Sequence, residues 1–586
     1  MAIYRAHWFI GVGIFAFAAS RRVSGTPVIP QQSSNISWFA CPDSATTQCA
    51  FFDVPRDYSR PSDNDTVSIF MRKLPATVSA QKKLGSIITN PGGPGTSGNV
   101  FVLGAYGEMF QAITDGRYDL IGFDPRGVNL TGPWPSCFDE EAKAVMLDFK
   151  SAMVGLPYPH SSFEVDRAVV NKISSIQAGV NSACIKNGNR KMLQSVGTAF
   201  VVQDIIRMSE ALGDDGVNYW GFSYGTVLGA TLAAMHPDSV KRMVLDGVSN
   251  AESYYNDIWQ WGIEGMTDTH KTYAGFLSMC AEAGPERCAF ATPPKGSKEK
   301  QTTESLRKRV DNVINQLGTR PLVVASSATG PGIVTASDLQ QMLLASLYNA
   351  NQWPTMMEPL ERGDGEAVYR SLYDHIASLP YKPYDQNIFH RPMLQYGSQE
   401  SAYMILCSDT RPTNISVDAY TDYNIGKISP VGEQWAVLPG YCNGWSFQAD
   451  QHYTGPWSSA GGLKKTRHPI LFLSLDADAV APLSSAIKMS DGFGKDSASL
   501  VVQHGFGHCT ISHPSLCTRK HVHDYFVDGK VPANGTHCSP EPGYIYPANS
   551  TLKRTNNSLS KRERLIEIIE KQKGSEGPIK PTTIVD

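Results

Sequence analysis

The stretch VNYWGFSYGTVLGATLAAMHPD, residues 217–238, indicates the fold class. A β-rich run over 217–220 leads into Gly221-Phe222-Ser223-Tyr224-Gly225, and a helical pattern with small residues follows. A serine on a strained strand-to-helix turn needs glycine on both flanks, because side chains there would collide with neighbouring backbone. The order of strand, turn and helix therefore predicts that Ser223 is a nucleophile.

A serine nucleophile needs a general base and an acid that orients the base. On this kind of turn the chain order is serine, then aspartate or glutamate, then histidine. Downstream, an apolar strand over 470–475 ends at Asp476 and Asp478, and a second strand over 500–503 ends at a loop with histidines. These two strand ends offer the missing partners.

The second loop, VVQHGFGHCT (501–510), allows three interpretations. A metal pair is disfavoured, because two glycines between His504 and His508 argue against a helix and no carboxylate motif accompanies them. A Cys509/His508 nucleophilic pair is disfavoured, because adjacent residues of an extended segment point apart. The remaining interpretation is one histidine that serves the distant serine. The other histidines, His513 included, are then loop or surface residues, and Cys509 is an unpaired or structural thiol.

Two further strand ends carry turn signals. The segment KLGSIITNPGGPGTSGN (83–99) passes from a strand into a glycine-rich loop, which can turn backbone N–H groups toward a bound group but also fits an ordinary turn. The segment YDLIGFDPRGVNLTG (118–132) closes a strand with Asp124-Pro125-Arg126-Gly127. We interpret Asp124 and Arg126 as structural support for this turn.

The motifs NPGGPGTSG, DPRGV, GFSYGT, DADAVAP and GFGH, in this order, resemble the α/β-hydrolase family that contains secreted tripeptidyl aminopeptidases and prolyl iminopeptidases. The segments 337–360 and 403–409 look like the same family. The resemblance implies an α/β fold of the α/β-hydrolase type. We therefore expect a mostly parallel central sheet with helices on both faces and a large, mainly helical cap insertion.

The resemblance also implies roles for single residues. Ser223 matches the nucleophile, and His508 matches the base in a Gly-x-Gly-His pattern. Asp478 matches the acid, because Asp478 to Pro482 fits the family's Asp-x-x-x-Pro pattern and Asp476 does not. The oxyanion hole is expected between the backbone N–H groups of Tyr224 and Gly93.

Two features of the family bear on other positions. Acidic cap residues hold the substrate's free amine in aminopeptidase relatives, and Asp409 and Glu400 are candidates between which the sequence does not select. Asn129 stands where a glycine is usual after the DPRG turn, and asparagine is the next most tolerant residue of positive φ.

The predicted domain organisation follows from these motifs. The segments are 1–20 (signal peptide), 30–250 (first part of the hydrolase core), 251–465 (helical cap insertion), 466–550 (second part of the core) and 551–586 (polar tail). Within the cap, the segment from 337 predicts a helix with Ser337 as N-cap and Gln340 three residues on. Its aromatic clusters at 254–262 and 347–353 are interpreted mainly as cap core.

The first residues and the sequons indicate export. A basic start, the short apolar run WFIGVGIFAFA and small residues at 18–20 are typical of a cleaved secretory signal, with an uncleaved anchor as the alternative. No other stretch is apolar and long enough to span a membrane. Glycosylation sequons occur at Asn35, Asn64, Asn129, Asn414, Asn534, Asn549 and Asn556. We expect a secreted, extracellular glycoprotein.

The 11 cysteines fall mostly into neighbouring pairs, which suits disulfides in an oxidising compartment. The pairs are Cys41/Cys49, Cys137/Cys184, Cys280/Cys288, Cys407/Cys442 and Cys517/Cys538, although sequence alone cannot assign connectivity. This pairing leaves Cys509 over.

Composition narrows the function classes. Lys plus Arg (52) nearly balances Asp plus Glu (55), so the net charge of −3 indicates no nucleic-acid or membrane-surface partner. The resemblance implies a secreted serine hydrolase, in the first place an aminopeptidase acting on peptides. An esterase, lactonase or natural-product tailoring hydrolase with a small acyl substrate is the alternative, and a binding protein on a hydrolase scaffold is a third. No metal or organic cofactor is expected, and the oligomeric state stays open.

Overall fold

The computed structural model describes residues 36–62, 64–138, 141–158, 165–326, 330–350, 353, 395–425 and 433–546. The predicted signal peptide (1–20), the polar tail (551–586) and the sequons at Asn35, Asn549 and Asn556 lie outside the described residues. Among the helices of these ranges, none has the length and apolarity that crossing a bilayer requires.

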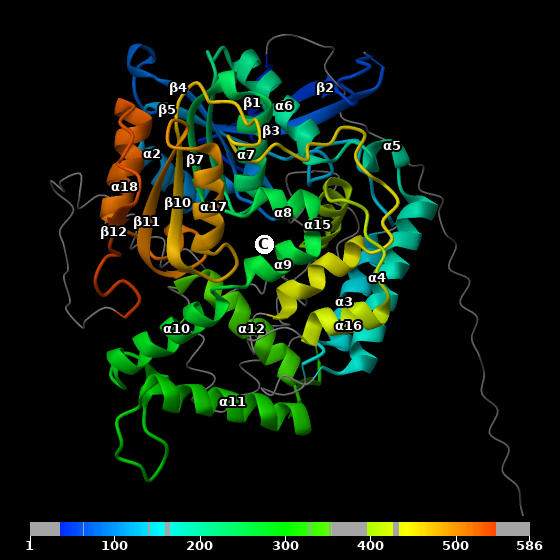
Figure 1. The fold of residues 1–586 in the computed structure, drawn as a ribbon, viewed down its shortest axis with the longest axis vertical. Coiled ribbons are helices and arrows are strands. Elements are labelled where there is room, and N and C mark those ends of the chain that lie inside the picture. Colours follow the sequence, from blue (N-terminus) through cyan, green and yellow to red (C-terminus); the bar gives the residue numbers. More distant parts are fainter. Residues whose placement is uncertain are drawn as a thin grey trace, which may run out of the picture.

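A sheet of ten strands, in the order β1-β2-β3-β5-β4-β6-β7-β10-β11-β12, forms the centre of the described chain (Figure 1). The strands are β1 (Phe39–Ala40), β2 (Gln48–Pro55), β3 (Thr66–Leu74), β4 (Gly85–Asn90), β5 (Tyr118–Phe123), β6 (Val217–Phe222), β7 (Val240–Asp246), β10 (Ile470–Asp478), β11 (Ala498–Gly507) and β12 (Thr536–Cys538). Neighbours from β5 to β12 pair in parallel, and only the pairs at the β1 edge are antiparallel. The carboxyl ends of the parallel strands therefore meet at one edge, where ligands bind in open α/β sheets.

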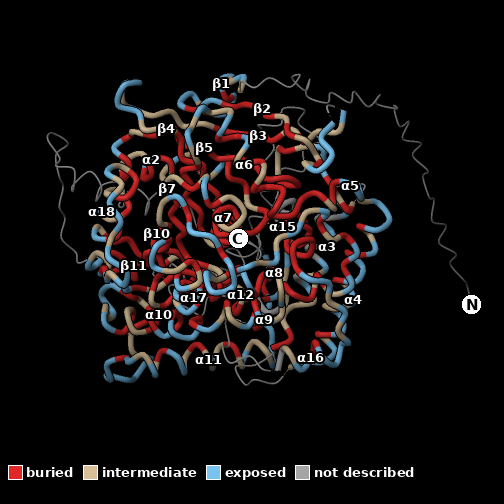
Figure 2. The backbone as a smooth tube through the Cα atoms, turned by 45° about the horizontal axis from the view of Figure 1, so that its top comes forward, coloured by how far each residue is buried: buried red, intermediate tan, exposed pale blue. Residues whose placement is uncertain are grey.

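Helices cover both faces of this sheet. Successive residues of a strand point to opposite faces, so neighbouring residues pack against different helices. Tyr219 joins a large hydrophobic cluster with α6 (Thr198–Leu212), α7 (Tyr224–Met235) and α17 (Leu483–Phe493). Its neighbour Trp220 joins a second cluster with α2 (Gly104–Ile113) and α18 (Leu516–His523). Figure 2 shows buried residues crowding the centre of the molecule around β7, β10 and α7. The predicted α/β-hydrolase architecture is confirmed.

The segment between β7 and β10 is mainly helical, as predicted for the cap. Its described helices of more than five residues are α8 (Ala251–Asn256), α9 (Ile258–Gly265), α10 (Thr269–Ala283), α11 (Thr303–Thr319), α12 (Ala336–Tyr348), α15 (Gln395–Asp409), α16 (Val417–Ile425) and the 3₁₀ segment η6 (Glu433–Cys442). A short hairpin of β8 (Leu322–Val324) and β9 (Gly332–Val334) lies between α11 and α12. In Figure 1, α9 to α12 lie below the carboxyl ends of β10 and β11.

Two helices that precede Ser223 in the chain also pack with the cap. Helix α3 (Glu141–Val154) contacts α15, and α4 (Arg167–Asn187) contacts α16 and η6. The disulfides Cys137–Cys184 and Cys407–Cys442 tie together the ends of these segments. The sequence did not predict this contribution from within 30–250, because contacts between distant helices leave no local pattern.

The N-cap of α12 is Thr335, so the expected N-cap Ser337 is wrong by two residues. The Thr335 side chain accepts from the backbone N–H of Asp338 (3.3 Å), and the Asp338 carboxylate accepts from the N–H of Thr335 (2.7 Å). This reciprocal pair satisfies two backbone donors at the helix start. Thr335 and Ser337 each carry a hydroxyl group and have a polar residue three positions later. Only the backbone conformation shows which of the two is the N-cap.

The cysteines pair as their spacing suggested. The structure has the disulfides Cys41–Cys49, Cys137–Cys184, Cys280–Cys288, Cys407–Cys442 and Cys517–Cys538. Cys509 is buried and free. It adopts a positive φ of 62° directly after His508, which turns the chain away from β11.

The DPRG turn is a structural element, as expected. Arg126 is fully buried and forms an ion pair with Asp204 at 2.7 Å. Asp124, also fully buried, accepts hydrogen bonds from Ser97 (2.5 Å) and Asn129 (3.1 Å). Asn129 has a φ of 40°, so asparagine takes the left-handed conformation for which a glycine is usual at this position.

Candidate active site

Ser223 occupies the turn between β6 and α7 with φ 56° and ψ −124°. Glycines stand two residues before and two residues after it because the backbone is crowded there: a Cβ on Gly221 would lie 2.3 Å from the Gly225 carbonyl oxygen. A Cβ on Gly225 would lie 2.6 Å from the carbonyl oxygen of Asn90 on β4. A non-glycine residue with such a φ stores strain that surrounding contacts must offset. The predicted elbow is therefore present, with Ser223 at its tip.

Asp478 is the last residue of β10, and His508 directly follows β11. The His508 Nδ1 lies 2.9 Å from Asp478 Oδ1 and 3.1 Å from Oδ2. Asp478 is fully buried and also accepts backbone N–H bonds from Ala481 (2.8 Å) and Cys509 (2.8 Å). Nδ1 faces a carboxylate and therefore carries the ring proton, which leaves Nε2 as the acceptor that a general base needs.

The carbonyl of Asp246, at the end of β7, brings the two halves of the site together. It accepts from the backbone N–H of Ser223 (3.0 Å) and from the Cys509 thiol (3.5 Å). His508 Nε2 is buried and has no hydrogen-bond partner within the described residues, the Ser223 hydroxyl included. Such hydrogen bonds are often long without substrate and shorten when it binds.

The oxyanion hole is predicted between the elbow and the loop after β4. A Cβ on Gly92 would lie 2.7 Å from the Ser223 Cβ, so this loop runs directly against Ser223. The Gly92 N–H donates to the Asn90 side chain at 3.0 Å. Within the described chain, the N–H groups of Gly93 and Tyr224 have no intramolecular acceptor. These two donors remain the candidates for an oxyanion.

A second Asp–His pair lies on the same two strands, with Asp476 two residues before Asp478 and His504 four residues before His508. His504 Nδ1 lies 2.7 Å from Asp476 Oδ2, and both side chains are more than a third exposed. Exposed pairs of this kind are weak and solvated. The two pairs differ in burial: Asp478 is fully buried at the end of β10, whereas the Asp476 side chain is 38% exposed.

His513 was expected to be a loop or surface residue; it lies in a loop but not at the surface. It is buried, at 4% exposure, and its Nδ1 accepts the backbone N–H of Phe506 at 3.3 Å. Burial lowers its pKa to about 4, so the imidazole is neutral. The neighbouring polar sequence gave no sign of this burial, which arises because the chain folds back onto β11.

Two further carboxylates near the elbow are buried: Asp246, which the sequence analysis did not name, and Asp409, one of its two candidates for amine binding. Asp246 accepts from the N–H of Thr510 (2.7 Å) and from its hydroxyl (2.6 Å), and burial raises the pKa of Asp246 to about 7. Asp409 accepts from the N–H of Thr198 (2.7 Å) and from the Tyr254 hydroxyl (2.9 Å), and burial raises its pKa to about 7 as well. Asp246 carries the same signal that led to Asp478, an acidic residue at the end of an apolar strand.

The two candidates for amine binding, Asp409 and Glu400, are both buried, at 0% and 4% exposure. Glu400 bonds the backbone N–H of Cys137. The Asp409 carboxylate is linked through Thr198 to Tyr224, the residue after Ser223: the Thr198 hydroxyl lies 2.5 Å from the Tyr224 hydroxyl. In this conformation both carboxylates accept hydrogen bonds from other groups of the protein.

The cap touches the site at Tyr348, the last residue of α12. The backbone N–H of His508 donates to the Tyr348 carbonyl at 3.0 Å, and the two rings meet edge to face with centroids 5.1 Å apart. The cap therefore supports the histidine directly.

The donor atoms suit hydrogen bonding better than metal binding. The ligand atoms of Asp478, His508 and Cys509 lie within 4.8 Å of one another. Burial raises the pKa of the Cys509 thiol well above its usual range, so it stays protonated, and a metal ligand must be a thiolate. A second group, Cys517, His521 and Cys538, contains a disulfide whose sulfurs are already bonded.

Comparison with known proteins places the chain in a family. Residues 428–538 match the model for TAP-like proteins, and residues 85–284 match the model for the alpha/beta hydrolase fold. The tripeptidyl aminopeptidase of Streptomyces lividans is 34% identical over 509 residues, which cover 84% of this chain and 84% of that protein.

Two mycobacterial proteins are similar over comparable lengths. Serine protease Hip1 of Mycobacterium tuberculosis (strain H37Rv) is 26% identical, over an alignment that covers 87% of this chain and 92% of that protein. Carboxylesterase B of M. tuberculosis (strain CDC 1551) is 25% identical, over an alignment that covers 88% of this chain and 92% of that protein. With the α/β-hydrolase fold and a relative of this identity and length, the chain belongs to the TAP-like family of α/β-hydrolases and is a serine hydrolase.

Proposed function

We propose that this hydrolase is an extracellular aminopeptidase that releases short N-terminal peptides or single residues through an acyl-enzyme. The observation that carries the proposal is the buried Asp478–His508 pair at the ends of β10 and β11, which the Asp246 carbonyl connects to the strained Ser223. The similarity to a tripeptidyl aminopeptidase over most of both chains supports the peptide substrate.

In this mechanism the Ser223 hydroxyl oxygen attacks the scissile carbonyl carbon while His508 Nε2 takes the hydroxyl proton. Asp478 holds the imidazolium in place through Nδ1. The N–H groups of Gly93 and Tyr224 stabilise the oxyanion, because they carry no other hydrogen bond within the described chain. His508 then gives its proton to the leaving amine, and water, activated by the same histidine, releases the acyl group.

An extracellular location is part of the proposal. The disulfides of the structure are typical of an oxidising compartment, and the first 20 residues have the pattern of a secretory signal. Asn64, Asn414 and Asn534 are exposed and suited to glycosylation, whereas the Asn129 amide nitrogen donates to Asp124 at 3.1 Å. Peptide mapping after enzymatic deglycosylation of secreted protein should find modified asparagine at exposed sequons and an unmodified Asn129.

The decisive experiment compares peptides with a free N-terminus with their N-acetylated forms and measures the masses of the products. An aminopeptidase cleaves only the free peptides, and the product mass gives the number of residues released. Ser223→Ala protein is the control for contaminating peptidases. Equal cleavage of the blocked peptides, or internal cleavage, would refute the aminopeptidase assignment.

An esterase or lactonase is the second candidate, and the similarity to a protein named Carboxylesterase B favours it. The steps through the acyl-enzyme are the same, so the cap alone discriminates. Hydrolysis of aryl esters with no cleavage of any free peptide or aminoacyl nitroanilide would select this candidate.

A further inference from the structure

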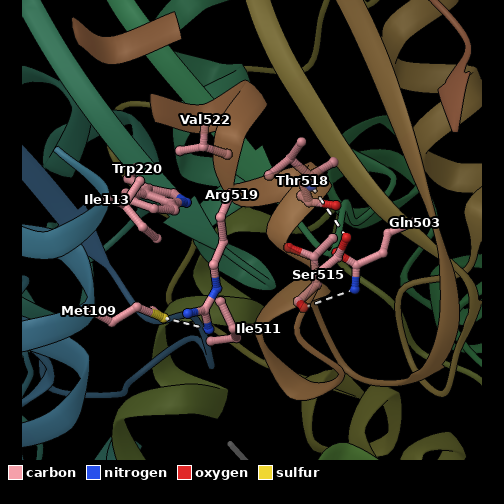
Figure 3. Close-up of a pocket in the computed structure, with 11 residues that line it drawn as sticks. Met109, Ile113, Trp220, Gln503, Ile511, Ser515, Thr518, Arg519 and Val522 are labelled. Atoms are coloured by element: carbon pink, nitrogen blue, oxygen red, sulfur yellow. Dashed lines mark hydrogen bonds between the residues drawn. The ribbon is translucent and has the colours of Figure 1, made fainter. Parts of the chain in front are cut away.

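A small pocket lies among α2, α18 and the central strands, next to the loop that follows His508. It has a volume of about 20 Å³, and its walls include Arg519, Trp220, Thr518 and Gln503. Figure 3 shows Arg519 running through the middle of the pocket toward Met109, with Trp220 on one side and Thr518 and Gln503 on the other. About 10–15 Å³ suffices for one water molecule, so the pocket admits a monatomic ion but excludes bulky ones.

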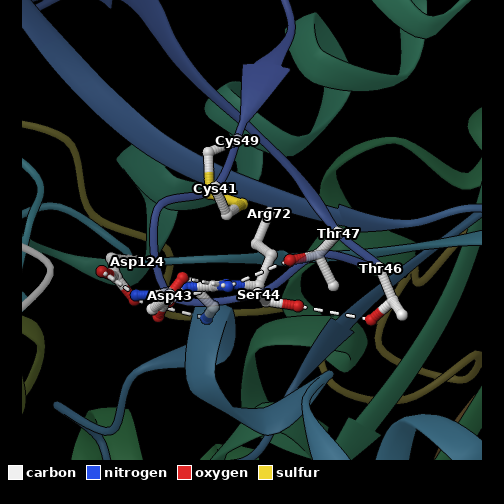
Figure 4. Close-up of a disulfide and its surroundings, with 9 residues drawn as sticks. Cys41, Asp43, Ser44, Thr46, Thr47, Cys49, Arg72 and Asp124 are labelled. Atoms are coloured by element: carbon white, nitrogen blue, oxygen red, sulfur yellow. Dashed lines mark hydrogen bonds and ion pairs between the residues drawn. A yellow bond between two sulfur atoms is a disulfide. The ribbon is translucent and has the colours of Figure 1, made fainter.

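Arg519 differs from the other buried arginines of the described chain. Arg72 forms two bonds to the Asp43 carboxylate, at 2.8 and 2.9 Å (Figure 4), and Arg126 pairs likewise with Asp204. Arg519 is only 6% exposed, and no described carboxylate lies within ion-pair distance of it. A buried charge without a counter-charge is strongly unfavourable, so this guanidinium requires a compensating negative group.

The hydrogen bonds of Arg519 are also incomplete. Its Nη2 contacts the Met109 sulfur at 3.6 Å, a weak acceptor, and its Nη1 has no partner in the described structure. Glu541 exerts some electrostatic attraction, but its carboxylate accepts the backbone N–H of Leu516 at 3.1 Å. Burial lowers the Arg519 pKa to about 10, so the side chain still carries its charge at neutral pH.

Other polar atoms of the pocket lack partners too. Trp220 Nε1 and Thr518 Oγ1 are buried and bond to no described group, and each can donate a hydrogen bond. Gln503 Oε1 is the unpaired acceptor. Its amide orientation is determined, because Nε2 donates to the carbonyls of Thr510 (3.1 Å) and His513 (2.6 Å). The walls therefore offer one positive charge and two further donors against one acceptor.

We propose that this pocket is a binding site for a monovalent anion of chloride size, held by Arg519. The anion supplies the missing counter-charge and accepts from the unpaired Nη1 of Arg519. A water molecule bound beside it donates to Gln503 Oε1, the remaining acceptor. Polyatomic anions with organic groups are excluded by the volume of the pocket.

The site adjoins the catalytic edge of the sheet. Gln503 holds the Thr510 carbonyl, and Thr510 in turn donates two hydrogen bonds to Asp246, whose carbonyl accepts the Ser223 N–H. A filled pocket therefore stabilises the segment directly after His508. We expect bound chloride to raise the melting temperature of the protein.

The test measures melting temperature as sodium gluconate is replaced by sodium chloride at constant ionic strength. Gluconate is the matched control because it is too large for the pocket. In the wild type, the melting temperature should rise along a single-site saturation curve, and bromide should act like chloride. Arg519→Met should show no dependence on chloride.

Two results would overturn the proposal. One is a melting temperature that is equal in both salts for the wild type, which would mean that water fills the pocket. The other is an equal chloride response in wild type and Arg519→Met, which would place the bound chloride elsewhere. If Arg519→Met does not fold, bromide-soaked crystals of the wild type decide: an anomalous peak beside Arg519 and Trp220 supports the site, and its absence refutes it.

Discussion

Oδ1 of Asp478 lies 2.9 Å from Nδ1 of His508, although 30 residues separate them in the chain. The pair forms because β10 and β11 are parallel neighbours whose carboxyl ends meet at the same edge. The same two strands carry Asp476 and His504, which form an exposed pair at 2.7 Å. This duplication provides an internal control for the function of the buried pair.

Asp478→Asn should lower kcat about ten-thousand-fold, because an amide no longer holds the reactive tautomer of His508. Asp476→Asn changes the same chemical group on the same strand and should leave kcat within about threefold of wild type, since exposed pairs contribute little. Steady-state kinetics on a cleavable substrate checks both variants. Equal losses in the two would show that the buried pair has no special role.

Gly92→Ala should reduce both stability and activity. The added Cβ would lie 2.7 Å from the Ser223 Cβ and 2.8 Å from the Phe222 carbonyl oxygen, at a φ of 114°. Gly104→Ala is the control, because Gly104 also has a positive φ, of 56°, but no atom within 4 Å of the new Cβ. It should lose only about 1 kcal/mol of stability with unchanged labelling by a fluorophosphonate. Full labelling of Gly92→Ala would contradict the close approach.

Tyr348→Ala should lower kcat about two- to tenfold with little change in KM, because the ring that packs on His508 is lost. Tyr348→Phe keeps that ring and should restore kcat. The backbone bond from His508 to the Tyr348 carbonyl is present in both variants. A loss of activity in both would indicate that the hydroxyl, and not the ring, matters.

Asp409→Asn should change how stability depends on pH. Burial raises the Asp409 pKa from 3.8 to about 7, so between these values the folded protein binds a proton that the unfolded chain releases. The stability from this proton is complete below pH 4 and is lost as pH rises through 7. The melting temperature of the variant relative to wild type should therefore rise from pH 5 to pH 7.5. Exposed Asp491→Asn is the control and should show a difference that does not vary with pH.

Removal of the Cys137–Cys184 disulfide should destabilise the protein more than removal of Cys41–Cys49. The first closes a loop with a sequence separation of 47 and the second one of 8. Loop-closure entropy gives losses of about 4 and about 2.5 kcal/mol. Denaturant unfolding of the two double-alanine variants checks the order. The reverse order would mean that native contacts outweigh the entropy of the unfolded chain.

The sequence predicted the parts of this protein whose cause is local. The turn around Ser223 needs glycines two residues away on either side, the apolar strands end at polar loops, and neighbouring cysteines close short loops; each is a pattern within a few dozen residues. The resemblance to a family then distinguished Asp478 from Asp476. These signals sufficed for the fold class and for the Asp–His pair.

Only the tertiary structure showed the features that depend on distant contacts. Tyr348 supports His508, the carbonyl of Asp246 joins the nucleophile's turn to the segment after His508, and α3 and α4 join the cap. His513 and Arg519 lie in polar-looking segments, yet both are buried. Burial and hydrogen-bond partners are properties of the assembled sheet and its helices, because which side chains meet depends on strand order and helix packing, and neither is encoded in local spacing.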